Sequence, residues 1–449
     1  MPLKSMILAL GIAAVPVAAP AEPPALNTAE TARPATPPIL SLRERAKVQD
    51  DWLKARLETV VPALMRANGI DMWVLVAREY FEDPVVKTML DAESLHARRR
   101  TILVFFDPGK GRPIERLTVS RYGLGGLFKP AWEPAKQPDQ WQGLADLIAR
   151  RDPKRIAINS SSLTAFADGM TLSQYQDFIA ALPEPLRARV EPNETLALGW
   201  LEQRIPAEMA RYPEIVRIAH AIIAEALSRK VITPGKTTTD DVVWWYRERI
   251  AALGLDTWFH PSVAVRRRGE KDMLEGDTVI RPGDLLWTDF GITYLGLNTD
   301  TQHMAYVLKA GESDAPAGLK AGLAAANAVQ DALTSSFRTG LSGNDILAAA
   351  RAKAIAQGLK PSIYSHPIGF HGHAAGTSIG FWDNQAAGPQ GEYRLRPDTA
   401  WSIELNATKA VPEWGGQEVE FRLEEDAFFD GKAVRYLDGR QDRFHLIGR

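Results

Sequence analysis

Residues 285–307, LLWTDFGITYLGLNTDTQHMAYV, hold two isolated acids within otherwise apolar sequence. The stretch contains two apolar, strand-like runs joined by a glycine-containing turn at residues 294–298, a pattern that predicts a β-hairpin. Each run carries one acid, Asp289 or Asp300. If the turn is centred near residues 294–295, these positions face each other, and facing side chains lie about 5 Å apart.

The two carboxylates of the predicted hairpin need a cation or a shared proton if they lie that close together. Like charges raise each other's cost of ionisation, so the pair favours a metal site. The alternative is that Asp289 and Asp300 are turn-flanking or edge-strand acids in water. A metal site requires further ligands from other parts of the chain.

Length and composition restrict the fold and the class of ligand. The chain has 449 residues, more than usually fold around a single hydrophobic core, so two domains are expected. The net charge of -2 gives no reason to expect nucleic acid or an anionic membrane as partner. There is no cysteine, so a metal must be bound by His, Asp and Glu, which favours a catalytic manganese, cobalt or zinc ion.

The first residues have the pattern of a cleaved export signal. Lys4 precedes an apolar run over residues 6–19, and Ala19 and Ala21 form a small-residue cleavage motif. The run is too short to span a bilayer. Residues 1–21 therefore predict a signal peptide and an exported protein, periplasmic or secreted, that leaves the membrane after cleavage. The alternative is an ordinary disordered tail.

The remaining chain is expected to form two α/β domains, in the broad sense that includes α+β. Residues 22–40 are rich in Pro and Ala and predict a tether. Residues 41–192 predict a smaller mixed domain, and residues 196–449 a larger one. In the first domain, Ser41 and Glu44 predict a helix with a capping box that stops near Gly69. Further elements are expected at 71–76, 101–106 and 155–159 as strands, and at 172–182 as a helix.

The second domain begins with long helical patterns. One is expected from Pro213 to about residue 230, and a second is capped by Thr239 and stops before Gly254. A strand containing His260 is expected at residues 257–265. Helices are then expected over residues 319–337 and from about residue 344.

Candidate ligands follow the hairpin at three places. Histidines 366, 371 and 373 lie in SHPIGFHGHAAG, where the glycines let the backbone approach a ligand. Glu404 interrupts an apolar strand at 401–405, and Glu424 lies in a strand-like run at 421–426. Two Asp, one His and two Glu make a hard ligand set that suits two divalent ions.

The order of these residues resembles the pita-bread metallopeptidase family, which includes methionine aminopeptidase, prolidase, aminopeptidase P and creatinase. Asp289 and Asp300 have the family's spacing, His366 in His-Pro-Ile-Gly matches its metal-binding His, and Glu424 lies in an Arg-Leu-Glu motif. More weakly, residues 41–192 resemble the creatinase-type N-terminal domain. The resemblance implies a pita-bread fold and five metal ligands: Asp289, Asp300, His366, Glu404 and Glu424.

Catalytic roles are implied by the same resemblance. Glu404 matches the general base, His373 matches the second His that contacts substrate, and His260 matches a His near the substrate carbonyl. Three features depart from the family. His260 is far upstream of Asp289, Thr301-Gln302-His303 replaces a common Arg, and Ala374 follows His373 where an acid is common.

Some assignments have alternatives. Glu420 could replace Glu424, although the Arg two residues before Glu424 favours the latter. His371 or His373 could replace His366 as the metal ligand, but neither has a His seven residues later. The candidate pocket residues are His371, His303, Phe381 and Trp382. The two histidines could line a pocket without touching substrate, and aromatic residues are more often core.

The resemblance implies a hydrolase in which a hydroxide bridging two divalent ions attacks a peptide carbonyl. Manganese is the expected metal, with cobalt or zinc as alternatives. An Xaa-Pro aminopeptidase or a prolidase-like dipeptidase acting on small peptides is expected, and a homodimer is left open. A non-peptide C–N or ester hydrolase on the same fold is the alternative. A non-catalytic binding module is a third hypothesis, against which the complete ligand set counts.

Overall fold

A computed structural model describes residues 36–448 of the chain. Contacts group Thr36–Arg449 into one compact unit. The predicted signal peptide and most of the predicted tether lie outside the described residues, so both stay predictions. The boundaries of two domains at residues 192 and 196 likewise stay a prediction. In the described part of the chain, no helix is long and apolar enough to cross a membrane.

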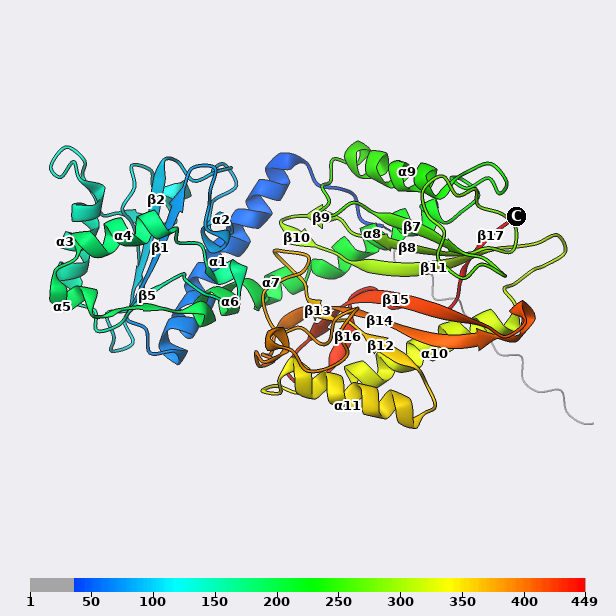
Figure 1. The fold of residues 1–449 in the computed structure, drawn as a ribbon. Helices are drawn as coiled ribbons and strands as arrows, with labels where there is room; N and C mark the ends of the chain where they lie inside the picture. The colour runs from blue at the N-terminus through cyan, green and yellow to red at the C-terminus, as the bar shows by residue number, and fades with distance from the viewer. Residues whose placement is uncertain (1–35, 449) are drawn as a thin grey trace, which may run out of the picture. The chain divides into compact units, whose positions relative to one another are not determined.

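The N-terminal part is built around helix α1 (Leu42–Ala67) and a six-stranded sheet (Figure 1). Ser41 and Glu44 form the expected capping box, and Gly69, with φ of 61°, follows the end of the helix. The strands, in the spatial order β4-β3-β2-β1-β5-β6, are β1 (Met72–Arg78), β2 (Arg100–Phe106), β3 (Glu115–Thr118), β4 (Lys129–Pro130), β5 (Ile156–Ile158) and β6 (Val190–Pro192). The short helices of this part are α2 (Pro84–Lys87), α3 (Gln140–Arg151), α4 (Leu172–Ala181) and α5 (Glu184–Arg187).

Helices α6 (Glu194–Glu202) and α7 (Pro206–Met209) lead from this sheet into the second part of the chain. The other helices of the second part are α8 (Tyr212–Ala226), α9 (Thr239–Ala252), α10 (Ala317–Thr334) and α11 (Gly343–Ala356). The cap of α9 is Thr238, not Thr239, because the Thr238 side chain accepts from the Asp241 N–H. The strand expected at residues 257–265 begins only at Ser262, which leaves His260 in the preceding loop.

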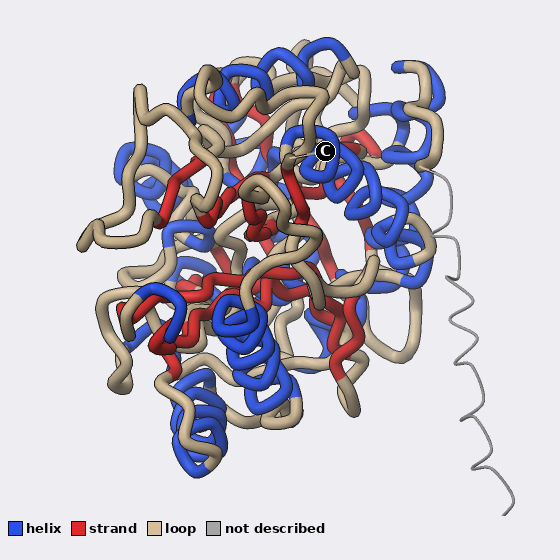
Figure 2. The backbone as a smooth tube through the Cα atoms, turned by 90° about the vertical axis from the view of Figure 1, so that its right-hand side faces the viewer, coloured by secondary structure: helices blue, strands red, loops and turns tan. Residues whose placement is uncertain are grey.

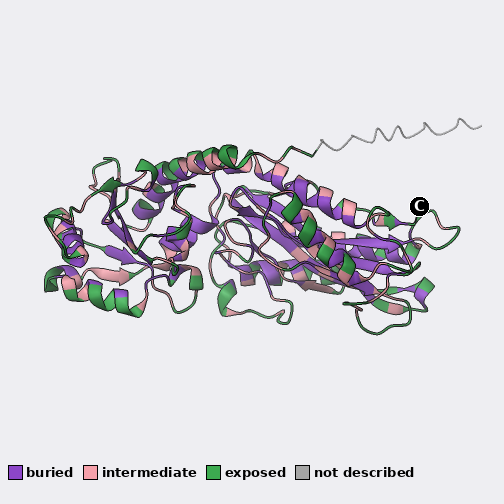
Figure 3. Cartoon of the chain, turned by 90° about the horizontal axis from the view of Figure 1, so that it is seen from above, coloured by how far each residue is buried: buried purple, intermediate pink, exposed green. Residues whose placement is uncertain are grey.

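A nine-stranded sheet forms the centre of the second part, and its strands are mostly buried (Figures 2 and 3). Its main path runs β12-β14-β15-β11-β8-β7. These strands are β7 (Ser262–Arg266), β8 (Leu285–Phe290), β11 (Thr301–Val307), β12 (Pro361–Ile363), β14 (Thr399–Val411) and β15 (Gln417–Phe429), with β13 (His366–Pro367), β16 (Val434–Tyr436) and β17 (His445–Ile447) paired beside them. Helix α10 packs on β14 and β15, while α8 packs on β11 and α9 on β7 (Figure 1). Helices thus cover both the β14–β15 part and the β7–β11 part of the sheet.

The tip of the predicted hairpin is shifted by one residue from its expected place. Strands β9 (Thr293–Tyr294) and β10 (Leu297–Asn298) are joined through Leu295 and Gly296, whose φ angles are 56° and 76°. Two positive φ angles are what the tight type I′ turn requires. Because of the shift, Asp289 pairs with Gln302 and not with Asp300. The expected direct pairing of the two acids is therefore corrected, although both remain on one face.

A buried ion pair joins α1 to α7. Arg56 Nη1 lies 3.1 Å from Glu208 Oε1, and the side chains are 1% and 0% exposed. We expect Glu208→Gln to lower the free energy of unfolding by about 3–5 kcal/mol, because it leaves the Arg56 charge buried without its partner. The check is urea unfolding of the two proteins.

The matched control for that pair is Asp51→Asn, which breaks the exposed Lys47–Asp51 pair within α1. Exposed pairs four residues apart in a helix contribute about 0.3–0.5 kcal/mol, so this variant should unfold nearly as the parent does. Equal effects of the two variants would show that burial does not decide the contribution of the Arg56–Glu208 pair.

Candidate metal centre

One row of polar side chains crosses four strands of the large sheet. Asp289 of β8 pairs with Gln302 of β11, Gln302 pairs with Glu424 of β15, and Glu424 pairs with Glu404 of β14. Side chains at facing positions of a sheet lie about 5 Å apart, so each member reaches the next. Residues far apart in the sequence meet here because of strand pairing.

Asp300 and His366 add two more candidate ligands beside this row, Asp300 from just before β11 and His366 from the start of β13. Asp300 immediately precedes β11, and its backbone N–H donates to the Asp426 carboxylate at 3.2 Å. His366 of β13 places Nε2 3.6 Å from Asp300 Oδ2 and 3.6 Å from Glu424 Oε1. The candidate ligand atoms form three overlapping sets, each within 4.8 Å: Asp289, Asp300 and Glu424; His366, Glu404 and Glu424; Asp300, His366 and His373.

The carboxyl groups of this row are strongly perturbed. Burial raises the pKa of Asp289, Asp300 and Glu404 well above their usual values, and the neighbouring Glu424 raises them further. Burial also raises the pKa of Asp426, an acid that the sequence analysis did not assign to the site. A buried group of like charges is stable only with protons or cations among them.

Three observations indicate that these residues can hold divalent ions. Among residues 36–448, Asp289 Oδ1, Asp300 Oδ1 and His366 Nε2 are buried without a hydrogen-bond partner. His366 Nδ1 lies 3.0 Å from the Pro367 carbonyl oxygen, to which it can donate its proton. Metal-binding histidines are usually oriented in this way, which leaves the other ring nitrogen for the ion. Mainly oxygen ligands with one imidazole suit ions of the manganese, cobalt or zinc type.

Glu420 does not lie in this cluster. Its carboxylate is exposed and contacts the Arg422 guanidinium at 2.7 Å. Glu424 is buried, and its Oε1 accepts a hydrogen bond from Ser402 Oγ. The strand therefore places the Glu424 carboxylate, and not that of Glu420, beside the other candidate ligands.

Gln302 is the one member of the row that is not an acid, and the sequence analysis did not assign it a role. Its Nε2 donates to Glu404 Oε1 at 2.8 Å and to Glu424 Oε2 at 2.7 Å. Its Oε1 accepts from Trp287 Nε1 at 2.9 Å, which orients the amide. One sequence feature could have identified Gln302 as a site residue. It lies two residues after Asp300, a spacing that places both side chains on the same face of a strand.

We expect Gln302→Leu to weaken metal binding or activity about 10–100-fold, which is the usual cost of losing a partner of metal ligands. The amide holds two of the candidate ligands, and leucine cannot donate to either. Isothermal titration with manganese and the rate of peptide hydrolysis would measure the change. Asn406→Leu is the control, since Asn406 lies in β14 and lines the same pocket. Equal losses in both variants would contradict a specific role of Gln302.

His373 lies beside the acid cluster and opens to a different pocket. Its ring is 4.7 Å from the His366 ring and 5.1 Å from the Trp258 ring, centroid to centroid. Burial lowers the pKa of His373, and the nearby His366 lowers it further. The neutral imidazole therefore predominates at neutral pH.

Two pockets of about 810 Å³ each reach this centre. The first pocket is lined by, among others, Asp289, Gln302, Tyr364, Trp382 and Glu404. The second pocket is largely apolar and is lined by, among others, Trp52, Phe166, Trp258, Phe370, His371 and His373. Trp258 and Tyr364 have no place in the sequence motifs, because only the fold brings them to the histidines.

Three of the candidate pocket residues lie near the centre. Trp382 is 78% exposed and lines the first pocket. Phe381 stacks on Tyr364 with ring centroids 5.5 Å apart. His371 lines the second pocket 4.4 Å from the Phe166 ring, and burial together with Arg204 and Lys87 lowers its pKa to about 4.

The structure places His260 and His303 away from the cluster. His260 is exposed in a loop beside α9, where its Nδ1 lies 3.1 Å from Arg247 Nη1. His303 follows Gln302 in β11 and so points to the opposite face of the sheet, where it contacts Glu425. The expectations that His260 assists the carbonyl and that His303 lines the pocket do not agree with these positions.

Several solved structures share the fold of this chain. An X-Pro aminopeptidase from Thermotoga maritima matches with a TM-score of 0.61 and 15% identity, over 86% of this chain and 100% of that one. An Xaa-Pro dipeptidase from Bacillus anthracis matches with a TM-score of 0.54 and 16% identity, over 91% and 100%. A prolidase from Pyrococcus horikoshii matches with a TM-score of 0.53 and 14% identity, over 89% and 99%. At these identities the likeness shows the fold, and it confirms the predicted α/β class with a pita-bread architecture.

The sequence comparisons point to one family. No curated protein sequence matches the chain significantly. Residues 211–427 match the family model described as metallopeptidase family M24, and this range contains Asp289, Asp300, His366, Glu404 and Glu424. This part, which carries the whole candidate metal centre, is similar to metallopeptidase family M24.

Proposed function

We propose that this protein is a peptidase with two divalent metal ions that cleaves Xaa-Pro peptides, either by removing the N-terminal residue or by splitting the dipeptide. The observation that carries the proposal is the cluster of carboxylates around His366, in which three ligand atoms, on Asp289, Asp300 and His366, have no hydrogen-bond partner among residues 36–448. Asp289, Asp300 and Glu424 would hold one ion, and His366, Glu404 and Glu424 the other. Manganese is the proposed metal, with cobalt or zinc as alternatives.

The ions would supply polarisation of the substrate carbonyl and activation of the attacking water. Glu404 has a raised pKa and lines the first pocket, so it is suited to take a proton from the water and return it to the leaving nitrogen. Gln302 holds one Glu404 oxygen by a hydrogen bond and so fixes the direction of the carboxyl group. His373 faces the second pocket and can donate a hydrogen bond to the carbonyl oxygen.

Two observations support the proposed specificity for proline. The solved structures that share the fold include enzymes named as X-Pro aminopeptidase, Xaa-Pro dipeptidase and prolidase. The second pocket offers the rings of Phe166 and Trp258 beside His373, an apolar wall that suits a pyrrolidine ring. Export through residues 1–21 is part of the same proposal, and peptides in the periplasm or medium would then be the substrates.

The test is hydrolysis of a peptide panel by protein loaded with manganese, cobalt or zinc. The panel pairs Xaa-Pro dipeptides and Xaa-Pro tripeptides with the same sequences carrying Ala for Pro, and it adds amidine and ester substrates. We expect cleavage at Xaa-Pro and little at Xaa-Ala. Hydrolysis of the amidine or ester substrates alone would support the non-peptide alternative, and full activity in metal-free protein would refute the metal mechanism.

A further inference from the structure

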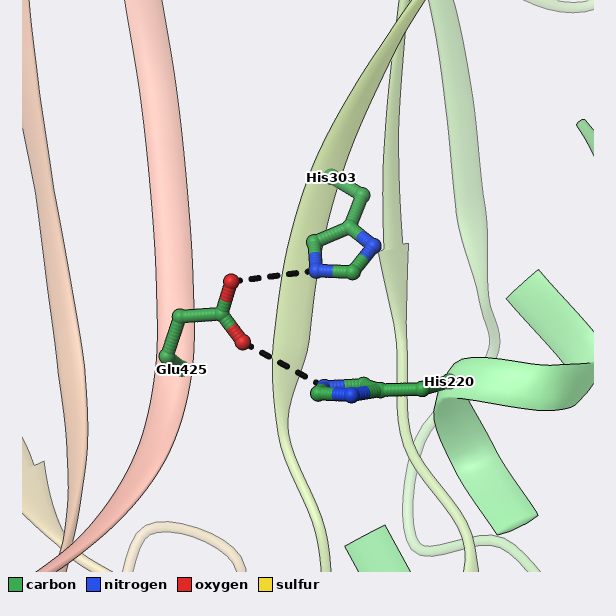
Figure 4. A group of neighbouring side chains, drawn as sticks. All are labelled: His220, His303 and Glu425. Atoms are coloured by element: carbon green, nitrogen blue, oxygen red, sulfur yellow. Dashed lines mark hydrogen bonds and ion pairs between the residues drawn. The ribbon is translucent and has the colours of Figure 1, made fainter. Parts of the chain in front are cut away.

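A second cluster of metal-ligating side chains lies directly behind the row of acids. It consists of His220 of α8, His303 of β11 and Glu425 of β15, which we call the back cluster (Figure 4). The row formed by Asp289, Gln302, Glu424 and Glu404 is called the front row here. His303 and Glu425 each follow a member of the front row by one residue, so they point to the opposite face of the sheet. Their side chains and that of His220 are at most 5% exposed.

The two imidazoles of the back cluster converge on one carboxylate. His303 Nε2 lies 3.1 Å from Glu425 Oε1, and His220 Nε2 lies 3.3 Å from Glu425 Oε2. Zinc holds nitrogen and oxygen ligands at about 2.0–2.2 Å, so ligand atoms on one ion are separated by roughly 3–3.5 Å. Both imidazole–carboxylate distances fall in this range, and one ligand atom from each of the three residues lies within 4.8 Å of the others.

The remaining ring nitrogens of both histidines have partners that orient them. His220 Nδ1 lies 3.1 Å from Asp438 Oδ2, and Asp438 also contacts Arg217 at 3.1 Å. His303 Nδ1 lies 3.3 Å from His445 Nε2. A carboxylate on the far nitrogen of a histidine, with the near nitrogen aimed at a shared point, is the usual arrangement around a bound metal.

Two buried atoms of the back cluster face each other as an ion pair without a well-formed hydrogen bond. Within residues 36–448, His220 Nε2 and Glu425 Oε2 are buried and have no hydrogen-bond partner, although they face each other at 3.3 Å. Arg217 balances the charge of Asp438, while the buried Glu425 carboxylate still requires a positive charge nearby. That charge is either an imidazole proton or a metal ion.

We propose that the back cluster binds a third divalent metal ion, held by His220 Nε2, His303 Nε2 and Glu425. Two imidazoles and one carboxylate are a zinc-type ligand set, whereas the front row is dominated by carboxylates and accepts manganese. The ion would join α8 to strands β11 and β15 behind Glu424. The proposal does not rest on the peptidase function, because it concerns residues on the other face of the sheet.

The first test uses crystals of the unaltered protein grown with zinc, and it records anomalous diffraction on both sides of the zinc absorption edge. A zinc peak between His220, His303 and Glu425 is the expected result. If zinc fully occupies the front row and no peak appears in the back cluster, the proposal is overturned. The back cluster would then be a hydrogen-bonded network that contains a protonated histidine.

The second test counts bound ions per chain by mass spectrometry after dialysis with zinc. We expect His220→Gln to lose one ion relative to the parent, while His260→Gln, which changes an exposed histidine, loses none. Asp289→Asn should lose ions only from the front row. Crystals of this variant grown with zinc should still show the zinc peak of the back cluster. An unchanged count in folded His220→Gln, with folding checked by circular dichroism, would refute the back site. Absence of front-row ions would instead refute the proposed metal mechanism.

Discussion

Asp289→Asn is expected to lower kcat/KM for an Xaa-Pro peptide by at least about a hundredfold and to reduce the metal content of the purified protein. Loss of a mere partner of a metal ligand already costs about 10–100-fold, so loss of the ligand itself should cost more. The amide keeps the shape of the side chain but removes the charge that faces Gln302 and the Glu424 carboxylate. Mass spectrometry of bound ions and initial rates would measure both effects.

The matched control for that variant is Glu420→Gln on strand β15. Glu420 undergoes the same exchange of acid for amide, but its carboxylate is exposed and contacts Arg422. We expect its metal content to stay at the parental value and its rate to fall little. A large metal loss in Glu420→Gln with none in Asp289→Asn would mean that the front row is not the metal centre.

His373→Asn is expected to lower kcat by about 10²–10³-fold while the metal content stays unchanged. Positioned acid–base groups and hydrogen-bond donors at a developing charge each contribute about this much. His373 lies next to His366 and opens to the apolar pocket, so its loss should act on the reacting substrate more than on the ions. Steady-state rates at saturating manganese would separate kcat from KM.

The control is His260→Asn, which makes the same exchange at a histidine in an exposed loop. We expect a rate within about twofold of the parent, because the surface substitution removes no contact with the front row. Loss of kcat in His260→Asn equal to that in His373→Asn would show that the loop carrying His260 moves onto the substrate.

Local patterns in the sequence were sufficient for elements whose causes lie within a few residues. The Ser41–Glu44 capping box and the stop at Gly69 predicted α1 with nearly its observed bounds. Strand patterns located β1, β2 and β5 to within a few residues. Caps and turns depend on hydrogen bonds between near neighbours, so the residue types alone contain that information.

Pairing between distant strands could not be predicted in this way. The turn at Leu295 and Gly296 moved the register by one residue and set Gln302, not Asp300, opposite Asp289. A register shift of this kind changes which side chains meet, although the composition of both strands is unchanged. For the same reason His303 lies behind the sheet with Glu425, and the sequence alone could not distinguish it from a pocket residue.

The residue types that can bind a metal, their order along the chain and the α/β class could all be inferred from the sequence alone. The absence of cysteine left only Asp, Glu and His, and the order of Asp289, Asp300 and His366 resembles that of the pita-bread metallopeptidases. The tertiary structure decided which of these atoms lie together, the place of Gln302 between the acids, the separation of His260 from the site, and the existence of the back cluster. These four outcomes depend on contacts between segments more than one hundred residues apart or on the face to which a strand turns each side chain, and no local pattern encodes them.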